Sequence, residues 1–302
     1  MNDRELTVER DGATLAGSLW LPEGEPLAAV VMHPGSGPSD RDNDGYFVPT
    51  REHLVAVGIA VGAFDKRGVR ESTGHWQEAG IVEQAGDAFA AVDAVFAQVG
   101  PDVPIGLFGH SQGGWVVLEA ARSEARVAFV ATSSGPGVTP AKQERFAAET
   151  KIARAGCSDA QRAALLEHYE LMLTLMRDGT PYADAQAILG PLARELALPV
   201  AVESLMYTPA DAAEWSLAAA IVDYDPAPAL RELRVPTLAL FGELDTGVPV
   251  DTSVDIFRRL VPAGLLTVGV LAGGDHRMQE GDPPELVAGY LETLSSFIAS
   301  VV

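Results

Sequence analysis

Short apolar runs alternate with segments of helical periodicity along most of this 302-residue chain. The apolar runs have the length and composition typical of parallel strands covered on both faces, and they occupy residues 28–32, 59–64, 105–108, 127–132, 237–241 and 265–271. Helical patterns connect them at residues 50–57, 81–99 and 112–121. This alternation predicts an α/β fold with a mostly parallel, doubly wound sheet and right-handed connections.

The two ends of the pattern add a hairpin and a closing helix to this prediction. Residues 5–8 and 14–21 are β-prone, and the Asp11-Gly12 dipeptide between them accepts the positive φ of a tight turn. Residues 284–298 have the periodicity of an amphipathic helix. We therefore expect the sheet to open with an antiparallel hairpin and the chain to close with a helix.

A helical block over residues 136–220 interrupts the alternation. Within it Leu165, Tyr169, Met172 and Met176 fall on one helical stripe. The composition, 47% hydrophobic, allows a large core but cannot choose between one domain and two. Because strand runs resume after the block, we expect one sheet domain of residues 1–135 and 221–302, interrupted by a helical cap at 136–220.

Charge and cysteine content argue against several classes of function. Twenty-one Lys and Arg against 42 Asp and Glu give a net charge of −21, which repels nucleic-acid phosphates and anionic lipid headgroups. The single cysteine, Cys157, excludes an intrachain disulfide and disfavours Cys-rich zinc or iron–sulfur sites. Residues 1–11 lack an apolar signal segment, and no run approaches the ~18 residues of a membrane span. We expect a cytoplasmic protein without a metal site and without nucleic-acid or membrane partners.

The chain contains one Gly-x-Ser-x-Gly pattern, at residues 109–113. It follows the predicted strand 105–108 and opens the predicted helix 112–121, which is the setting of a nucleophile elbow. A serine at such a turn holds strained dihedrals, and side chains at Gly109 or Gly113 would collide with neighbouring backbone. The pattern predicts Ser111 as a nucleophile, and the alternative is a glycine-rich turn with an incidental serine.

A serine hydroxyl needs a base within hydrogen-bond reach, and the base needs a carboxylate to orient it. In hydrolases with this turn the nucleophile comes first along the chain, then the acid, then the histidine. Only His276 follows the last predicted strand of the sheet. It lies in a loop at the edge where ligand sites of α/β sheets collect. The remaining histidines are expected at surface or packing positions, and they are His33, His53, His75, His110 and His168.

Asp245 is the preferred acid, because it lies in the loop that leaves the strand 237–241 at the same edge as Ser111. Its competitors are Glu243, Asp251 and Asp275. Glu243 stays close to the strand end, and Asp275 is too near His276 in sequence to reach behind its ring easily.

Acyl transfer also needs hydrogen-bond donors for the oxyanion that develops on the carbonyl oxygen. The backbone N–H of Gln112, directly after the nucleophile, is one expected donor. The second is expected from the glycine-containing loop after strand 28–32, where Pro34 has no N–H. Ser36 is the first choice and Gly35 the second.

These motifs give the sequence a resemblance to the α/β-hydrolase superfamily. It is most similar to the serine esterase and acyl-peptidase-related group with the motifs Gly-Ser-Gly-Pro-x-Asp-Arg-Asp, Asp-Lys-Arg-Gly and Gly-His-Ser-x-Gly-Gly, found here at residues 35–42, 65–68 and 109–114. The resemblance implies a nucleophile, acid and base at Ser111, Asp245 and His276, with oxyanion donors at Ser36 and Gln112.

Two residues depart from the family pattern. Arg70 stands where a second glycine usually follows Asp-Lys-Arg-Gly, and Pro34 stands where many relatives have the histidine of a His-Gly pair. Neither departure removes a catalytic group. Arg41, Asp65 and Arg67 recur in the family pattern, and we interpret them as turn-fixing ion pairs in preference to substrate contacts.

The sequence therefore favours a cofactor-free serine hydrolase of small-molecule carboxylic esters. An amidase or peptidase, a thioesterase or acyltransferase, and a non-catalytic binding protein of the same fold remain alternatives, and a homo-oligomer is left open. Candidate pocket residues are Gly35, His75, Trp76, Tyr169, Met172 and Trp215, although an apolar helical stripe more often forms a cap's own core.

Overall fold

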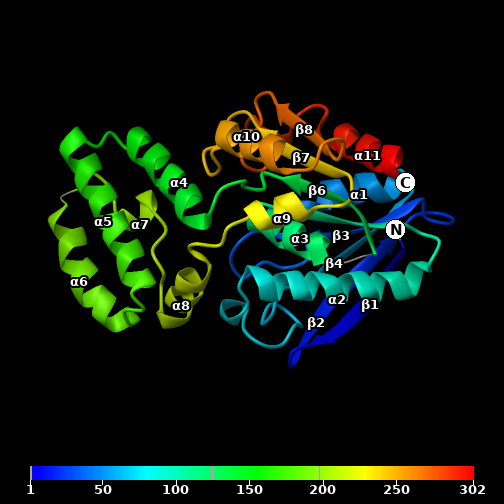
Figure 1. Cartoon of the computed structure of the whole chain (residues 1–302), viewed down its shortest axis with the longest axis horizontal. Helices are drawn as coiled ribbons and strands as arrows, with labels where there is room; N and C mark the ends of the chain where they lie inside the picture. The colour runs from blue at the N-terminus through cyan, green and yellow to red at the C-terminus, as the bar shows by residue number, and fades with distance from the viewer. Residues whose placement is uncertain (1, 124–125, 197) are drawn as a thin grey trace. The chain divides into compact units, whose positions relative to one another are not determined.

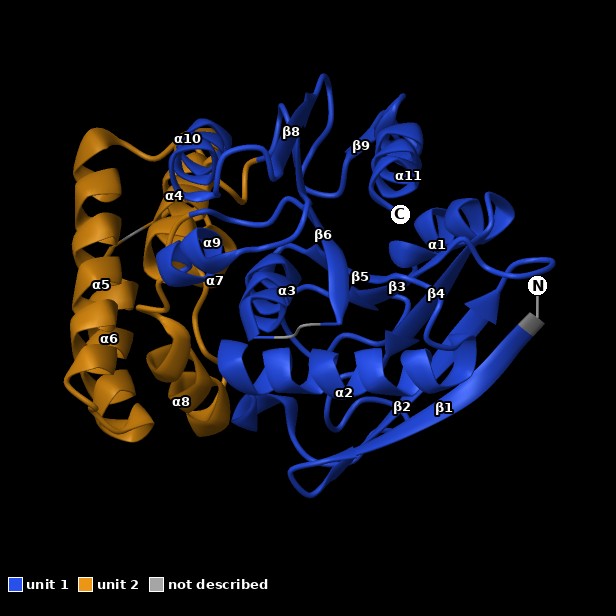
Figure 2. Cartoon of the chain, turned by 45° about the vertical axis from the view of Figure 1, so that its right-hand side comes forward, with its two compact units in different colours: residues 1–137, 226–245, 250–302 blue, residues 138–225, 246–249 orange. Residues whose placement is uncertain are grey.

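The computed structural model describes residues 2–123, 126–196 and 198–302, and the chain forms two compact units (Figure 1, Figure 2). Unit 1 comprises residues 1–137, 226–245 and 250–302, and unit 2 comprises residues 138–225 and 246–249. Residues 136–220, where the sequence predicts a helical cap, overlap unit 2. The short segment 246–249 has no counterpart in that prediction.

Unit 1 is built on a sheet that contains eight strands within the described residues, in the order β1-β2-β4-β3-β5-β6-β7-β8 (Figure 1). Their bounds are β1 (Asn2–Arg10), β2 (Ala13–Leu21), β3 (Ala28–His33), β4 (Ile59–Phe64), β5 (Ile105–His110), β6 (Val127–Ser133), β7 (Thr237–Gly242) and β8 (Leu266–Leu271). The pairs β1/β2 and β2/β4 are antiparallel, and the other pairs are parallel. The predicted fold class, a mostly parallel α/β sheet, is confirmed.

Helices cover both faces of this sheet. The helical segments of unit 1 are α1 (Phe47–Ala56), η1 (Trp76–Glu78), α2 (Ile81–Val99), α3 (Gln112–Ser123), α9 (Ala227–Glu232), α10 (Val250–Leu260) and α11 (Tyr290–Val301). Val30 and Met32 on β3 share a buried cluster with side chains of α1 and α11. The opposite face packs against α2, which also contacts α3 (Figure 1). Strands β3, β4, β5 and β7 are buried along their whole length, as their continuous apolar runs require.

Two predicted helices begin at other residues than the sequence pattern indicates. The closing helix α11 begins at Tyr290 instead of residue 284, because residues 285 and 286 pair as β10 (Glu285–Leu286) with β9 (Gln279–Glu280). Gly289 follows in the left-handed region, with φ of 83°, and forms the N-cap. Helix α1 begins at Phe47, before residue 50, because Pro49 lies in its first turn, where the missing N–H has no helical partner.

Unit 2 has its own hydrophobic core. Its helices are α4 (Pro140–Arg154), α5 (Asp159–Arg177), α6 (Tyr182–Glu195), α7 (Val202–Leu205) and α8 (Ala212–Ile221). Helix α5 starts with a capping box formed by Ser158 and Gln161, and its predicted apolar stripe is buried within the unit. None of the helices in the described part of the chain has both the length and the apolar composition that a membrane crossing needs.

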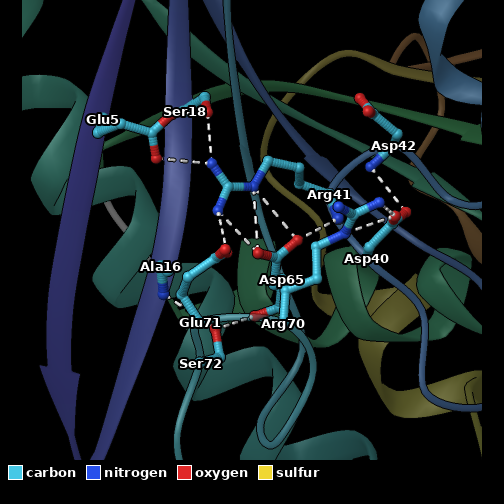
Figure 3. Close-up of polar contacts among 10 residues, drawn as sticks. All are labelled: Glu5, Ala16, Ser18, Asp40, Arg41, Asp42, Asp65, Arg70, Glu71 and Ser72. Carbon is cyan, nitrogen blue, oxygen red and sulfur yellow. Dashed lines mark hydrogen bonds and ion pairs between the residues drawn. The ribbon is translucent and has the colours of Figure 1, made fainter.

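A polar network in unit 1 joins the β1/β2 hairpin to the loops that follow β3 and β4 (Figure 3). Its centre is Asp65, whose side chain is fully buried. The guanidinium of Arg41 donates to both carboxylate oxygens of Asp65, with Nη2 to Oδ2 at 2.7 Å, and the backbone N–H of Arg41 donates to Oδ1 at 2.7 Å. The same guanidinium donates to Glu5 on β1 at 2.8 Å and to Ser18 on β2.

A second ion pair in the network involves Arg70, the residue that departs from the family pattern (Figure 3). Arg70 has φ of 47°, so the backbone keeps the left-handed conformation that a glycine would adopt at lower cost. Its Nε donates to Asp40 at 2.8 Å, but more than half of its side chain is exposed. The turn is thus retained, and an ion pair to the loop after β3 is added.

The burial of Asp65 leads to a prediction for stability. Arg41→Ala removes the cation from a carboxylate that has no access to water, so we expect the free energy of unfolding to fall by about 3–5 kcal/mol. Arg70→Ala removes an exposed pair and should cause a much smaller loss. Urea denaturation followed by circular dichroism measures both changes. Equal losses in the two variants would contradict the central role given to Asp65.

Candidate active site

Ser111 lies at the turn between β5 and α3, with φ of 53°, a value uncommon for residues other than glycine. Its N–H donates to the carbonyl of Ser133 on β6 at 3.0 Å, and its own carbonyl accepts from Gly114 N–H at 2.8 Å. A Cβ at Gly109 would overlap the carbonyl oxygen of Gly113, and a Cβ at Gly113 would lie 2.5 Å from the carbonyl oxygen of His33. The two glycines therefore allow the turn to pack against the end of β3.

His276 lies in the loop after β8, and its ring contacts both Ser111 and Asp245. Nε2 lies 3.0 Å from Ser111 Oγ, and Nδ1 lies 2.8 Å from Oδ2 of Asp245. An ionised carboxylate only accepts, so Nδ1 carries the proton and Nε2 is left to accept the serine hydroxyl. The side chain of Asp245 is fully buried, whereas 31% of the His276 side chain is exposed. The arrangement couples a reachable base to a carboxylate shielded from water.

The competing carboxylates have other partners. Glu243 accepts from the backbone N–H of Gly273 at 3.1 Å, and Asp275 accepts from the N–H groups of Arg277 and Gln279. Asp251 lies in the first turn of α10. Among the described residues, Asp245 is thus the carboxylate hydrogen-bonded to His276.

The other histidines lie in varied surroundings. His53 is hydrogen-bonded to Ser295, His168 is buried on α5, and His75 is exposed. His110 is buried next to the nucleophile, where its Nδ1 donates to the carbonyl of Ser133, and its ring centre lies 5.1 Å from that of His276. Burial, followed by the nearby His276 and Arg277, lowers the pKa of His110 well below its ordinary value. A neutral His110 places no positive charge beside the ring of His276.

The two expected oxyanion donors lie at the ends of neighbouring strands. Ser36 is an exposed residue of the loop after β3, and Gln112 is the buried first residue of α3. Within the described residues neither backbone N–H has a hydrogen-bond acceptor, and the start of a helix favours negative charge. A Cβ at Gly35 would lie 3.6 Å from that of Ser111, so this loop passes close to the nucleophile.

The remaining candidate pocket residues lie in different parts of the structure. Trp76 lines a small cavity of about 20 Å³ in unit 1, together with His33 and Lys66. The side chains of Tyr169 and Met172 on α5 and Trp215 on α8 are buried in the core of unit 2. Such packing within a cap is what an apolar helical stripe favours.

One residue of this region receives no role from the sequence pattern. Lys66 follows β4 within the Asp-Lys-Arg-Gly motif, and its ammonium donates to the carbonyl of Gly35 and to Oε1 of Gln112. The signal available in the sequence is a lysine two residues after the end of a fully buried strand. Its neighbours have other partners, because Arg41 pairs with Asp65, and Arg67 forms a bidentate pair with Asp87.

The sheet order and the serine turn define an α/β hydrolase, and comparison with known proteins supports this class. Residues 24–175, about half of the chain, match the family model Hydrolase_4, described as Serine aminopeptidase, S33. The chain belongs to this family, and the resemblance drawn from the motifs is confirmed. A comparison with curated protein sequences gives no match.

Solved structures similar to this chain include hydrolases of several kinds. An esterase of Pyrococcus furiosus has a TM-score of 0.64 at 16% identity, over 99% of this chain and 91% of that one. A proline iminopeptidase from Mycobacterium smegmatis has a TM-score of 0.63 at 20% identity, over 98% of both chains. Est1E from Butyrivibrio proteoclasticus, solved with ferulic acid, has a TM-score of 0.60 at 18% identity, over 98% of both. At such identities the likeness establishes the fold.

The close approach of Gly113 to β3 leads to a prediction. Gly113→Ala should push the loop after β3 away from the serine turn, lowering the free energy of unfolding by about 1–3 kcal/mol and reducing kcat/KM. The matched control is Gly190→Ala on α6, where an added Cβ meets only the end of the Arg194 side chain. Urea denaturation and steady-state kinetics test the pair. Wild-type stability and activity in Gly113→Ala would contradict the packing argument.

Proposed function

We propose that this hydrolase cleaves carboxylic esters through an acyl-enzyme formed on Ser111. The observation that carries the proposal is the continuous hydrogen-bonded chain from Ser111 Oγ to His276 at 3.0 Å and from His276 to Asp245 at 2.8 Å. The left-handed backbone of Ser111 and the free N–H groups of Ser36 and Gln112 support the same chemistry.

In the first half-reaction Ser111 Oγ forms a bond to the acyl carbon while Nε2 of His276 takes the hydroxyl proton. The carbonyl electron pair moves to oxygen, and the N–H groups of Ser36 and Gln112 bind this oxyanion. When the tetrahedral intermediate collapses, the bond to the alkoxy oxygen breaks, and the alcohol leaves with the proton from His276. Water then attacks the acyl carbon while His276 takes its proton. The bond to Ser111 Oγ breaks, the proton returns from His276 to Oγ, and the carboxylic acid is released.

A second candidate activity is aminopeptidase or amidase cleavage, which the family description favours. It uses the same three residues and adds the need to bind a substrate ammonium group. Around His276 the acidic side chains already serve other donors, since Asp245 accepts from the imidazole and Glu243 and Asp275 accept from backbone N–H groups. Comparing the turnover of esters with that of aminoacyl amides decides between the two activities.

A thioesterase or acyltransferase would share the acyl-enzyme and differ in the nucleophile that resolves it. Competing alcohols, amines and thiols in the assay would reveal transfer products. The hydrogen-bonded order of Ser111, His276 and Asp245 favours catalysis over a non-catalytic binding role.

The nucleophile can be identified by covalent labelling. A fluorophosphonate probe should modify Ser111, because the activated hydroxyl attacks phosphorus as it attacks an acyl carbon. Peptide mass spectrometry locates the adduct. Ser111→Ala should lose the label, and Ser296→Ala, at an exposed position on α11, should retain it. Undiminished labelling of Ser111→Ala would remove the assignment.

Kinetics on a panel of esters and aminoacyl amides distinguish Asp245 from Glu243 as the acid. Asp245→Asn should lower kcat on the preferred ester by about 10³–10⁴-fold, because the amide stabilises neither the required tautomer nor the imidazolium. Glu243→Gln, in the same loop, should stay within a few-fold of wild type, since its partner is a backbone N–H. Equal effects of the two substitutions would exclude Asp245 as the acid. If the aminoacyl amides are turned over faster than the esters, amides and not esters are the preferred substrate class.

A further inference from the structure

Lys66 is a buried cation without a buried counter-ion. The residue is 8% exposed, and in the described part of the chain its ammonium forms no ion pair. Burying a charge is costly unless hydrogen bonds compensate for the lost water. The two hydrogen bonds to Gly35 and Gln112 are the compensation that the structure offers. The free-energy cost of burying this charge indicates a functional role for Lys66.

The charged and titratable groups around Lys66 leave its positive charge unopposed. Asp65 is paired with Arg41, and Asp87 on α2 is paired with Arg67. On β3, His33 is hydrogen-bonded to Gln84, and burial together with the charge of Lys66 lowers the pKa of His33 to about 3, so the imidazole is neutral. Burial lowers the pKa of Lys66 itself to about 7.

Each acceptor of Lys66 belongs to a group that also supplies an expected oxyanion donor. For one donor this group is the peptide unit between Gly35 and Ser36, and for the other it is the residue Gln112. The carbonyl of Gly35 and the N–H of Ser36 are parts of one peptide unit, which is planar and trans, so that the two groups point in opposite directions. A hydrogen bond that holds the carbonyl therefore fixes the direction of the N–H. An ammonium on the carbonyl oxygen also polarises the unit and strengthens its N–H as a donor.

Gln112 supplies the other donor through its own backbone. Its side-chain oxygen accepts from Lys66 Nζ at 3.3 Å, so the same ammonium is hydrogen-bonded to both residues of the expected oxyanion hole. No other lysine or arginine among the described residues has hydrogen bonds to both. The contacts of Lys66 thus link the loop after β3 to the first turn of α3.

We propose that Lys66 is the positioning residue of the oxyanion hole, where its ammonium aligns and polarises the donors at Ser36 and Gln112. The inference rests on the acyl-enzyme function proposed above and assigns Lys66 no contact with substrate. Its effect is largest when charge develops on the carbonyl oxygen, so Lys66 acts on the transition state more than on substrate binding.

The charge of Lys66 gives the reaction a pH dependence of a stated sign. Below about pH 7 the ammonium keeps its proton, and above that value the side chain becomes a neutral amine with weaker hydrogen bonds. Activity on an uncharged ester therefore falls as the pH rises through the pKa of Lys66, because the oxyanion donors are less well held.

The test compares Lys66→Met with Lys142→Met, a lysine-to-methionine change at an exposed position on α4. With an uncharged ester and chromatographic detection of products, kcat of Lys66→Met should fall by about 10–100-fold, less than the ~10²–10³-fold caused by removing an oxyanion donor outright. KM should change by less than about twofold, and the rate of fluorophosphonate labelling should fall with kcat. Lys142→Met should match wild type.

A measurement on the unaltered protein keeps the proposal testable if Lys66→Met fails to fold. The wild-type kcat should decline between about pH 6 and 9, with a midpoint near the pKa of Lys66. An unchanged kcat in folded Lys66→Met overturns the proposal, and so does a wild-type kcat that does not decline over this range. If wild-type Ser111 is labelled and the ester is cleaved, either result rejects the role of Lys66 alone. Absence of labelling would instead reject the proposed function.

Discussion

The geometry of the candidate site depends on one steric constraint, the sharp turn by which β5 passes into α3. Ser111 can hold its left-handed backbone only because Gly109 and Gly113 carry no Cβ where the turn meets the backbone of α3 and β3. This close packing brings the loop after β3 against the nucleophile and turns the first N–H groups of α3 toward the same edge of the sheet. The hydrogen bonds to His276 and Asp245 complete a site that the turn has already positioned.

Much of this arrangement could be predicted from the sequence because it is encoded locally. A buried strand has to be apolar, and a strand-to-helix turn bearing a serine needs glycines around it, so β5, Ser111 and α3 are readable from residues 105–121. The predicted start of α11 is wrong, because the pairing of β9 with β10 depends on residues outside the helix pattern. The sequence pattern predicts no role for Lys66 for a similar reason, because its partners Gly35 and Gln112 lie 31 and 46 residues away along the chain.

Asp65, Lys66 and Asp87 are buried ionic groups, and they differ in how their burial is compensated. Asp65 and Asp87 each have a bidentate arginine, which makes these pairs suited to fixing the backbone. Within the described residues Lys66 has only neutral acceptors, so its charge is stabilised less and can be lost near neutral pH. An ion pair that fixes the backbone and a titratable side chain thus arise from adjacent residues of a single motif.

The distance along the chain between nucleophile and base also bears on how the protein is made. Ser111 and His276 are 165 residues apart, and Asp245 precedes the histidine by 31. During synthesis the serine turn leaves the ribosome long before His276 is made, and closing so long a loop is a late and slow event in folding. The hydrogen-bonded chain from Ser111 to Asp245 therefore forms only in molecules whose sheet has acquired its last strands.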